Sequence, residues 1–201
     1  VGLILLQRDL GSVVIIGTLI WMMMFVGGAR FVHLMALLLV ALPLGYYLVL
    51  KEGYRLQRIL SFLDPWKDRY GSGFQVIQSY LAFNEGGFLG KGLGAGQQKL
   101  FYLPEAHTDF IFAVIGEELG FIGVLFVVGL FVFFCYRGFL VALRTQDLFG
   151  RYLAFGITAL IGFQALCNMA VVPGLLHTKG LVLPFISYGG SSLVITMFSV
   201  G

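Results

Sequence analysis

The chain has few charged residues. Lys, Arg, Asp and Glu make up 11% of its 201 residues, while 59% are hydrophobic and the mean hydropathy is +0.93. A soluble domain carries about 25% charged residues, so this scarcity excludes an ordinary water-soluble fold. The strand-like alternation of a membrane barrel is also missing. The composition therefore indicates an integral membrane protein built from helices.

The chain has only two cysteines and a small net charge. Cys135 and Cys167 are the only cysteines and both lie in apolar segments, so we expect neither a disulfide nor a cysteine metal site. The net charge is only +3, and no basic run with interleaved aromatic residues occurs. This pattern argues against nucleic-acid binding.

Four apolar runs are long enough to cross a bilayer as helices, which takes roughly 20 residues each. The chain opens without Met inside an apolar run (1–6) and ends inside another (189–201), so we expect a piece of a longer multi-pass protein. The expected fold class is all-α: a polytopic integral membrane helical bundle, forming one membrane domain over residues 1–201. It would contain two partial spans and four full ones, at residues 10–28, 31–50, 110–136 and 152–172.

One connection is much longer than the others. Residues 51–108 hold 7 of the 13 basic and 5 of the 10 acidic residues. The short connections on the opposite side carry a denser positive charge, with Arg residues at 30, 137, 144 and 151. By the positive-inside rule that side is cytoplasmic, and 51–108 form a large extracytoplasmic loop. A loop of this length is uncommon and often functional.

The long loop contains a glycine-rich tract, residues 86–99. It fails as a Walker motif, because Glu85 stands where the first glycine is required and Gly92 where Ser or Thr is required. Its glycines do not fit the dinucleotide fingerprint either. Two interpretations remain open: a flexible turn, or a backbone surface that lets a substrate come close.

A carboxylate stands at the expected start of the third span. Asp109 follows Thr108 and precedes an apolar run at the outer membrane face. One interpretation is a helix cap formed by Thr108 or Asp109. The other is a general base at a partly buried position, where a carboxylate suits proton abstraction.

Two further acids lie inside the same expected span. Glu117 is eight residues beyond Asp109, which is about 12 Å along a helix axis, and Glu118 follows it. Intramembrane acids usually face the protein interior. We therefore expect a structural polar pair, bonded to neighbours such as Gln164 or Asn168.

Three polar clusters meet at the expected outer face: residues 7–9, 105–109 and 179–192. In the last, Gly189 and Gly190 permit an unusual backbone, and Ser191 and Ser192 can cap the next helix, whose amides can hold an anion. Acid at the interface with scattered basic residues fits an enzyme that acts on a lipid-linked phosphate. It equally fits a transporter vestibule.

Long motifs make the pattern specific. In order along the chain, the sequence resembles the SEDS family (FtsW, RodA and SpoVE) in the segments QRDLG, FLDPWKDRYGSGFQVIQS, GGFLGKGLG, LPEAHTDFIFAVIGEELGFIG and LLHTKGLVLPFISYGGSSL. The resemblance covers essentially all 201 residues, about the C-terminal half of a ten-span protein. The segments DPWKD and YLPEAHTDF lean toward the FtsW branch.

The resemblance implies a peptidoglycan glycosyltransferase of the bacterial inner membrane that polymerises lipid II during cell division. Asp109 matches the family's essential acid and would deprotonate the acceptor sugar, while undecaprenyl pyrophosphate leaves, steadied by basic groups or a divalent cation (Mg²⁺ or Mn²⁺). The metal site is unknown. Expected partners are a class B penicillin-binding protein, a transpeptidase, and other divisome proteins. For that transpeptidase the small residues of the fourth span, Ala154, Gly156, Ala159 and Gly162, offer a contact surface, or they pack within the chain.

We expect the substrate to contact residues from all the polar clusters and from the long loop. Two other roles stay open for the whole protein, a lipid II flippase and a non-catalytic divisome scaffold. The predicted substrate-binding residues are Gln7, Asp9, Gln75, Lys91, Glu105, His107, Thr108, Lys179, Ser187 and Ser191.

Overall fold

The computed structural model describes residues 10–50, 64–68, 73–96, 108–176 and 182–201. Every regular element within these ranges is helical, which confirms the all-α prediction. The elements are α2 (Leu10–Val26), α3 (Phe31–Leu50), the short 3₁₀ helix η1 (Pro65–Asp68), α5 (Phe74–Gly86), α7 (Ile111–Arg144), α8 (Leu148–Val171) and α9 (Gly190–Val200).

Two of the described helices, α7 and α8, are long and apolar enough to cross a membrane. The helices α2, α3 and α9 are apolar but shorter over the residues whose side chains are described. The predicted end of the third span at Tyr136 is wrong, because α7 continues to Arg144. We placed the end before Arg137 because this charge interrupts the apolar run. Six apolar or small residues follow Arg137, and the helix continues through them.

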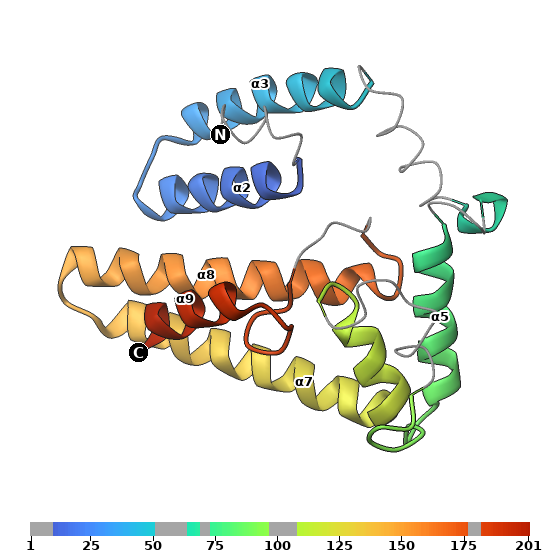
Figure 1. Ribbon diagram of the computed structural model, residues 1–201. Helices are drawn as coiled ribbons and strands as arrows, with labels where there is room; N and C mark the ends of the chain where they lie inside the picture. The colour runs from blue at the N-terminus through green and yellow to red at the C-terminus, as the bar shows by residue number, and fades with distance from the viewer. Residues whose placement is uncertain (1–9, 51–63, 69–72, 97–107, 177–181) are drawn as a thin grey trace.

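The helices α7 and α8 form an antiparallel hairpin (Figure 1). The Asp147 side chain caps α8 by accepting a bond from the Gly150 amide at 2.7 Å. The two helices pack closely at two glycines. A Cβ added to Gly138 of α7 would lie 2.2 Å from Thr158 Oγ1 of α8, and one added to Gly162 of α8 would lie 2.7 Å from Cys135 Sγ of α7.

The small residues of α8 therefore pack within the chain. Gly162 faces α7, and a Cβ on Gly156 would lie 3.4 Å from the Met23 sulfur of α2. Of the two interpretations of these residues, intramolecular packing is the one that the structure supports.

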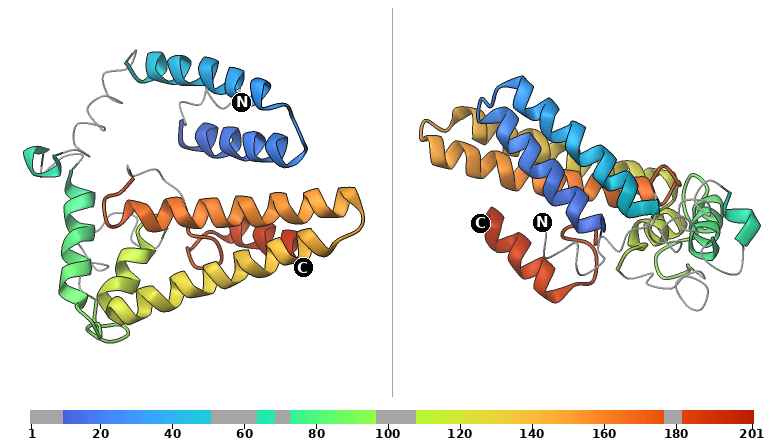
Figure 2. Two further views of the ribbon diagram at one scale, coloured as in Figure 1. Left: turned by 180° about the vertical axis from the view of Figure 1, so that it is seen from behind. Right: turned by 90° about the horizontal axis from the view of Figure 1, so that it is seen from above.

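Helix α5 lies across the ends of α7 and α8, and Figure 2 shows the same crossing from behind. It falls within residues 51–108, the predicted large extracytoplasmic loop, for which the sequence analysis specified no helix. Ser79 ties α5 to the end of α8, since its hydroxyl lies 3.3 Å from the Val172 carbonyl oxygen. Tyr80 packs over Gly174, where an added Cβ would overlap its hydroxyl.

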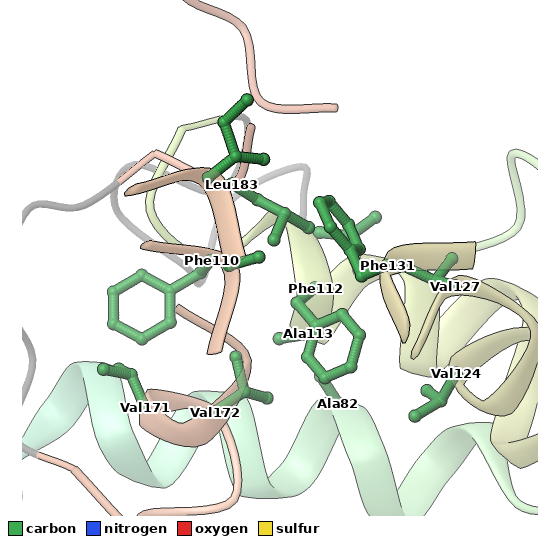
Figure 3. Packing of buried hydrophobic residues seen from close by; sticks show 13 residues of the cluster. Ala82, Phe110, Phe112, Ala113, Val124, Val127, Phe131, Val171, Val172 and Leu183 are labelled. Atoms are coloured by element: carbon green, nitrogen blue, oxygen red, sulfur yellow. The ribbon is translucent and has the colours of Figure 1, made fainter. Parts of the chain in front are cut away.

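The main hydrophobic core lies where α5, both parts of α7, the end of α8 and Leu183 meet (Figure 3). Phe110 and Phe112 are the large side chains from the start of α7. Burying each contributes about 1.5–3 kcal/mol. The core therefore anchors the first turn of α7, immediately after Asp109.

Helix α7 is broken near its start. Gly120 has φ 65° and ψ −164°, so the helical ladder is interrupted there, and Figure 1 shows the two parts of α7 meeting at an angle. In a bilayer the backbone groups released by such a break need partners inside the protein. Those partners come from residues 87–96, which we call the glycine loop.

The glycine loop bonds to both sides of the break. The amides of Lys91 and Gly92 donate to the carbonyls of Glu117 and Glu118, each at 3.0 Å. In return, Gly87 and Phe88 accept bonds from the amides of residues 121 and 122 at 2.9 and 3.3 Å.

The glycines of the tract make this contact possible. A Cβ on Gly90 would lie 2.1 Å from the Glu118 oxygen, and one on Gly120 would lie 2.3 Å from the Gly90 nitrogen. Of the two interpretations offered for the tract, the structure shows a close-approach surface, but the group approached is the backbone of α7.

We predict that Gly120→Ala destabilises the full-length protein. A positive φ costs a residue with a Cβ about 1–3 kcal/mol, and the overlap with Gly90 adds to this. Thermal unfolding in detergent measures the effect. Gly129→Ala is the matched control on the same helix, because no atom lies within 4 Å of its added Cβ. Equal unfolding temperatures for the two variants would show that the break does not require glycine.

Candidate active site

Asp109 stands just before α7, where the chain enters the core. The N-cap residue of α7 is Phe110, so neither Thr108 nor Asp109 occupies the cap position. Phe110 is buried at 2% exposure, whereas Asp109 is half-buried. The carboxylate is thus carried by a backbone that the adjacent buried ring holds in place.

Two polar side chains from other segments hold the backbone at this point. Asn168 of α8, 1% exposed, donates from Nδ2 to the Asp109 carbonyl oxygen at 2.9 Å. Ser187 donates from its hydroxyl to the Thr108 carbonyl oxygen at 2.6 Å and accepts from the Leu183 amide at 2.6 Å. These bonds fix the peptide units on either side of the Asp109 Cα, and so they limit where its carboxylate can point.

The segment that supplies Ser187 has a strained turn. Phe185 has φ 66°, and it is the one non-glycine residue with a positive φ in the described part of the chain. Its ring packs edge-on against Phe134 of α7 at 5.8 Å between centroids. Such strain persists where surrounding packing over-determines it, and it concentrates at functional sites.

The start of α9 differs from the prediction. Gly189, with φ −167° and ψ 88°, is the N-cap, so Ser191 and Ser192 lie in the first turn instead of capping it. The Leu193 amide closes that turn on the Gly189 carbonyl at 2.8 Å.

The two acidic side chains of α7, which we predicted to be a structural pair, contact the glycine loop. Glu117 is 0% exposed, and its Oε1 lies 3.5 Å from Lys91 Nζ. Glu118 Oε2 accepts a bond from the Gly94 amide at 3.0 Å. The residues expected as partners bond to backbone carbonyls elsewhere: Gln164 Nε2 donates to Val182 at 3.1 Å, and Asn168 to Asp109.

In the described part of the chain, Lys91 provides a positive charge next to the acidic residues at the break of α7. Its ammonium pairs with Glu85 at the end of α5 and with Glu117 on α7. The hydrogen bond to Glu85 raises the pKa of Lys91 above its usual value. Loss of hydration opposes this increase, and the charges of Glu85 and Glu117 add to it. Lys91 is therefore protonated at neutral pH.

The structure brings together three of the predicted site residues, Thr108, Asp109 and Ser187. Gln75 lies in the first turn of α5, and Lys91 lies at the break of α7. Ser191 is exposed at the start of α9. The other five, Gln7, Asp9, Glu105, His107 and Lys179, lie outside the described residues.

Sequence reasoning missed the contact that Asn168 makes with the site. The polar side chain of Asn168 in an apolar helix predicted a buried hydrogen bond, but the sequence did not indicate which backbone carbonyl would accept it. Gly120 was missed as well, because a single glycine in an apolar run does not distinguish a break from a close helix contact.

No group of three His, Cys, Asp or Glu side chains in the described part of the chain is placed to hold a metal ion. Glu105 and His107, which adjoin Asp109 in sequence, lie outside that part.

Known proteins match along the whole chain. The chain is 54% identical over 200 residues to the probable peptidoglycan glycosyltransferase FtsW of Geobacter metallireducens, covering 100% of this chain and 53% of that protein. It is 49% identical over 200 residues to the stage V sporulation protein E of Bacillus subtilis, covering 99% and 54%. The chain thus spans about half the length of the curated relatives it matches.

Two solved structures share the fold. One comes from work on the coordination of polymerization and crosslinking by a peptidoglycan synthase complex, with 36% identity and a TM-score of 0.78 over 100% of this chain and 56% of that one. The other is an Asp-to-Ala variant of the rod shape determining protein RodA of Thermus thermophilus, with 30% identity and a TM-score of 0.63 over 99% and 50%.

The family described as cell cycle proteins of the FtsW, RodA and SpoVE type matches residues 1–201. Together with the apolar helices, this match indicates a membrane location. The whole described region, from α2 to α9, therefore lies within the match, and the chain belongs to the FtsW/RodA/SpoVE family.

Proposed function

We propose that the full-length protein is a peptidoglycan glycosyltransferase that polymerises lipid II into glycan strands during bacterial cell division. The observation that carries the proposal is the half-buried Asp109 just before α7, whose flanking backbone carbonyls accept hydrogen bonds from Asn168 and Ser187. The relatives named peptidoglycan glycosyltransferase, about half identical to this chain, support the reaction class.

In the proposed reaction Asp109 is the general base. It takes the proton from the acceptor sugar hydroxyl, whose oxygen then bonds to the anomeric carbon of the donor. The bond from that carbon to the pyrophosphate oxygen breaks, and undecaprenyl pyrophosphate leaves with its electron pair. A base that takes up the proton as the new bond forms lowers the barrier, typically by a factor of 10²–10⁴ in rate.

We predict that Asp109→Asn in the full-length protein lowers glycan polymerisation by about 10²–10⁴-fold, because the amide cannot accept the proton. Gel analysis of glycan made from lipid II measures this. Asp147→Asn is the matched control, since asparagine caps a helix as well as aspartate and Asp147 only caps α8. Normal synthesis by a normally folded Asp109→Asn protein would contradict the proposal and favour a flippase or a scaffold.

We further propose that the active site faces the outside of the inner membrane. Figure 1 places the glycine loop and the connection between α7 and α8 at opposite ends of α7. The connection carries a denser positive charge than the long loop does, with Arg144 and Arg151 beside Thr145–Asp147. Such a charge is typical of the cytoplasmic side.

This orientation predicts labelling. In a background without other reactive cysteines, Leu93→Cys should react with a membrane-impermeant thiol reagent added outside intact cells, and Gln146→Cys should react only after lysis. Both positions are exposed in the structure, so the protein itself does not block the reagent from either side chain. The reverse pattern would place Asp109 on the cytoplasmic side and exclude external polymerisation.

A transpeptidase of the penicillin-binding class B type is the proposed partner. Its support is the fold neighbour from a complex that couples polymerization with crosslinking. The small residues of α8 pack within the chain. We therefore place the contact on the charged segment 51–69 of the long loop, of which the structure describes only residues 64–68.

We predict that a saturating class B transpeptidase raises the polymerisation rate of the purified full-length protein. A partner activates only when it binds the active arrangement better than the resting one. Rates with and without the partner, with complex formation verified by size-exclusion chromatography, make the measurement. An identical rate in the verified complex would leave recruitment as the partner's only role.

A further inference from the structure

Because α7 is broken at Gly120, the orientation of its first part is not set by the helical hydrogen bonds of its second part. A continuous helix would fix residues 111–119 relative to the rest, but at Gly120 the helical conformation stops and restarts. Sharp bends of this kind need an identifiable cause, such as glycine or an inserted group. Asp109 lies two residues before Ile111, so its place depends on what holds the break.

The glycine loop bridges the two parts. Its Lys91 amide donates to the Glu117 carbonyl on the first part, and its Gly87 carbonyl accepts from the Phe121 amide on the second. A bridge made mainly of backbone bonds at an exposed loop opens easily, since loops with few buried contacts lie at the low end of local stability.

Two contacts that involve charged side chains add to the bridge: Glu118 accepts a bond from the Gly94 amide, and Lys91 pairs with Glu117. Lys91 binds Glu117 twice, by its amide to the carbonyl oxygen at 3.0 Å and by its ammonium to the carboxylate at 3.5 Å. The same ammonium also binds Glu85 on α5. Lys91 thus joins α5, the glycine loop and the first part of α7.

The environment of Glu117 gives this contact its strength. The Glu117 side chain is 0% exposed, while that of Lys91 is 31% exposed. Removing the cation from a buried carboxylate is destabilising, because the remaining charge of Glu117 stays in a medium that solvates it poorly. The loop and the first part of α7 are therefore coupled through this pair.

We propose that Lys91 is a positioning residue: through Glu117 it holds the glycine loop on the break of α7, and the held break sets where Asp109 stands. This rests on the proposed function, in which Asp109 is the general base. Lys91 itself acts at a distance, since Glu117 lies eight residues from Asp109, about 12 Å along a helix.

The test uses the purified full-length enzyme with lipid II and the polymerisation assay. Lys91→Met and Glu117→Gln each break the pair, whereas Lys91→Arg keeps the cation, and Lys91→Gln combined with Glu117→Gln replaces the ion pair by two neutral groups. Lys67→Met is the matched control, because Lys67 pairs with Asp64 at the surface with 83% of its side chain exposed.

We expect Lys91→Met and Glu117→Gln to lower kcat between about 10-fold and 10²-fold with KM nearly unchanged, the range expected when a reacting group is displaced by about 1 Å. Lys91→Arg should retain most of the turnover. The double variant should regain part of the loss seen in Lys91→Met, because it removes the buried Glu117 charge together with the Lys91 cation. Lys67→Met should match the wild type.

Amide hydrogen exchange gives a readout that does not depend on catalysis. In Lys91→Met, peptides containing the amides of Lys91, Gly92, Phe121 and Ile122 should exchange faster, since these amides make the bonds across the break. Peptides from the α7–α8 hairpin should be unchanged, which also shows that the variant is folded.

The outcomes separate this inference from the proposed function. Normal kcat in Lys91→Met, alongside an inactive Asp109→Asn, overturns the positioning role alone. A raised KM with normal kcat, or lost turnover with unchanged exchange at the break, shows that Lys91 contacts the substrate and also overturns it. An active Asp109→Asn overturns the proposed function, and the exchange data then decide only whether Lys91 holds the break.

Discussion

The backbone hydrogen bonds between the glycine loop and the two sides of Gly120 are the constraint on which the rest of this structure depends. A helix that stops and restarts inside a membrane protein exposes amides and carbonyls that lipid cannot satisfy. The loop supplies partners on both sides of the break. It can lie this close only because Gly86, Gly90 and Gly120 have no Cβ to meet the opposing backbone.

The break turns the start of α7 into a short independent segment that joins several elements. Its apolar side enters the core with α5 and the end of α8 (Figure 3). Its first backbone carbonyls are held by Asn168 and Ser187. A backbone held from several directions limits where the Asp109 side chain can lie, and the proposed role of Asp109 as a general base requires such positioning. The polar residues of these helices thus serve to fix a backbone beside Asp109.

Features that depend on local sequence were predictable. Apolar runs define the helical class, and α8 ends at Val171, one residue from the predicted end. The motif around Asp109 and the segment containing Ser187 were both assigned to one site, and the structure joins them through the Thr108 carbonyl. Helix α7 was predicted too short because a single Arg137 interrupted the apolar run.

Features that depend on non-local contacts were not predictable. Lys91, which contacts Glu117, lies 26 residues away in a glycine-rich tract that sequence alone leaves as a turn or a substrate surface. The role of Asn168 depends on a contact across 59 residues. Helix α5 was overlooked because the charged residues around it led us to interpret 51–108 as one loop, although Val76, Ile77 and Ala82 form a buried face at helical spacing.

The central claim is that the carboxylate held at the start of α7 removes the proton of the acceptor sugar. Chemical rescue tests it most directly: polymerisation by full-length Asp109→Ala is measured against rising formate, a small carboxylate that fits the space vacated by the side chain. The account predicts almost no glycan without formate and a rate that rises with formate concentration, with no such increase for the wild type. A wild-type rate from Asp109→Ala in the absence of formate would contradict it.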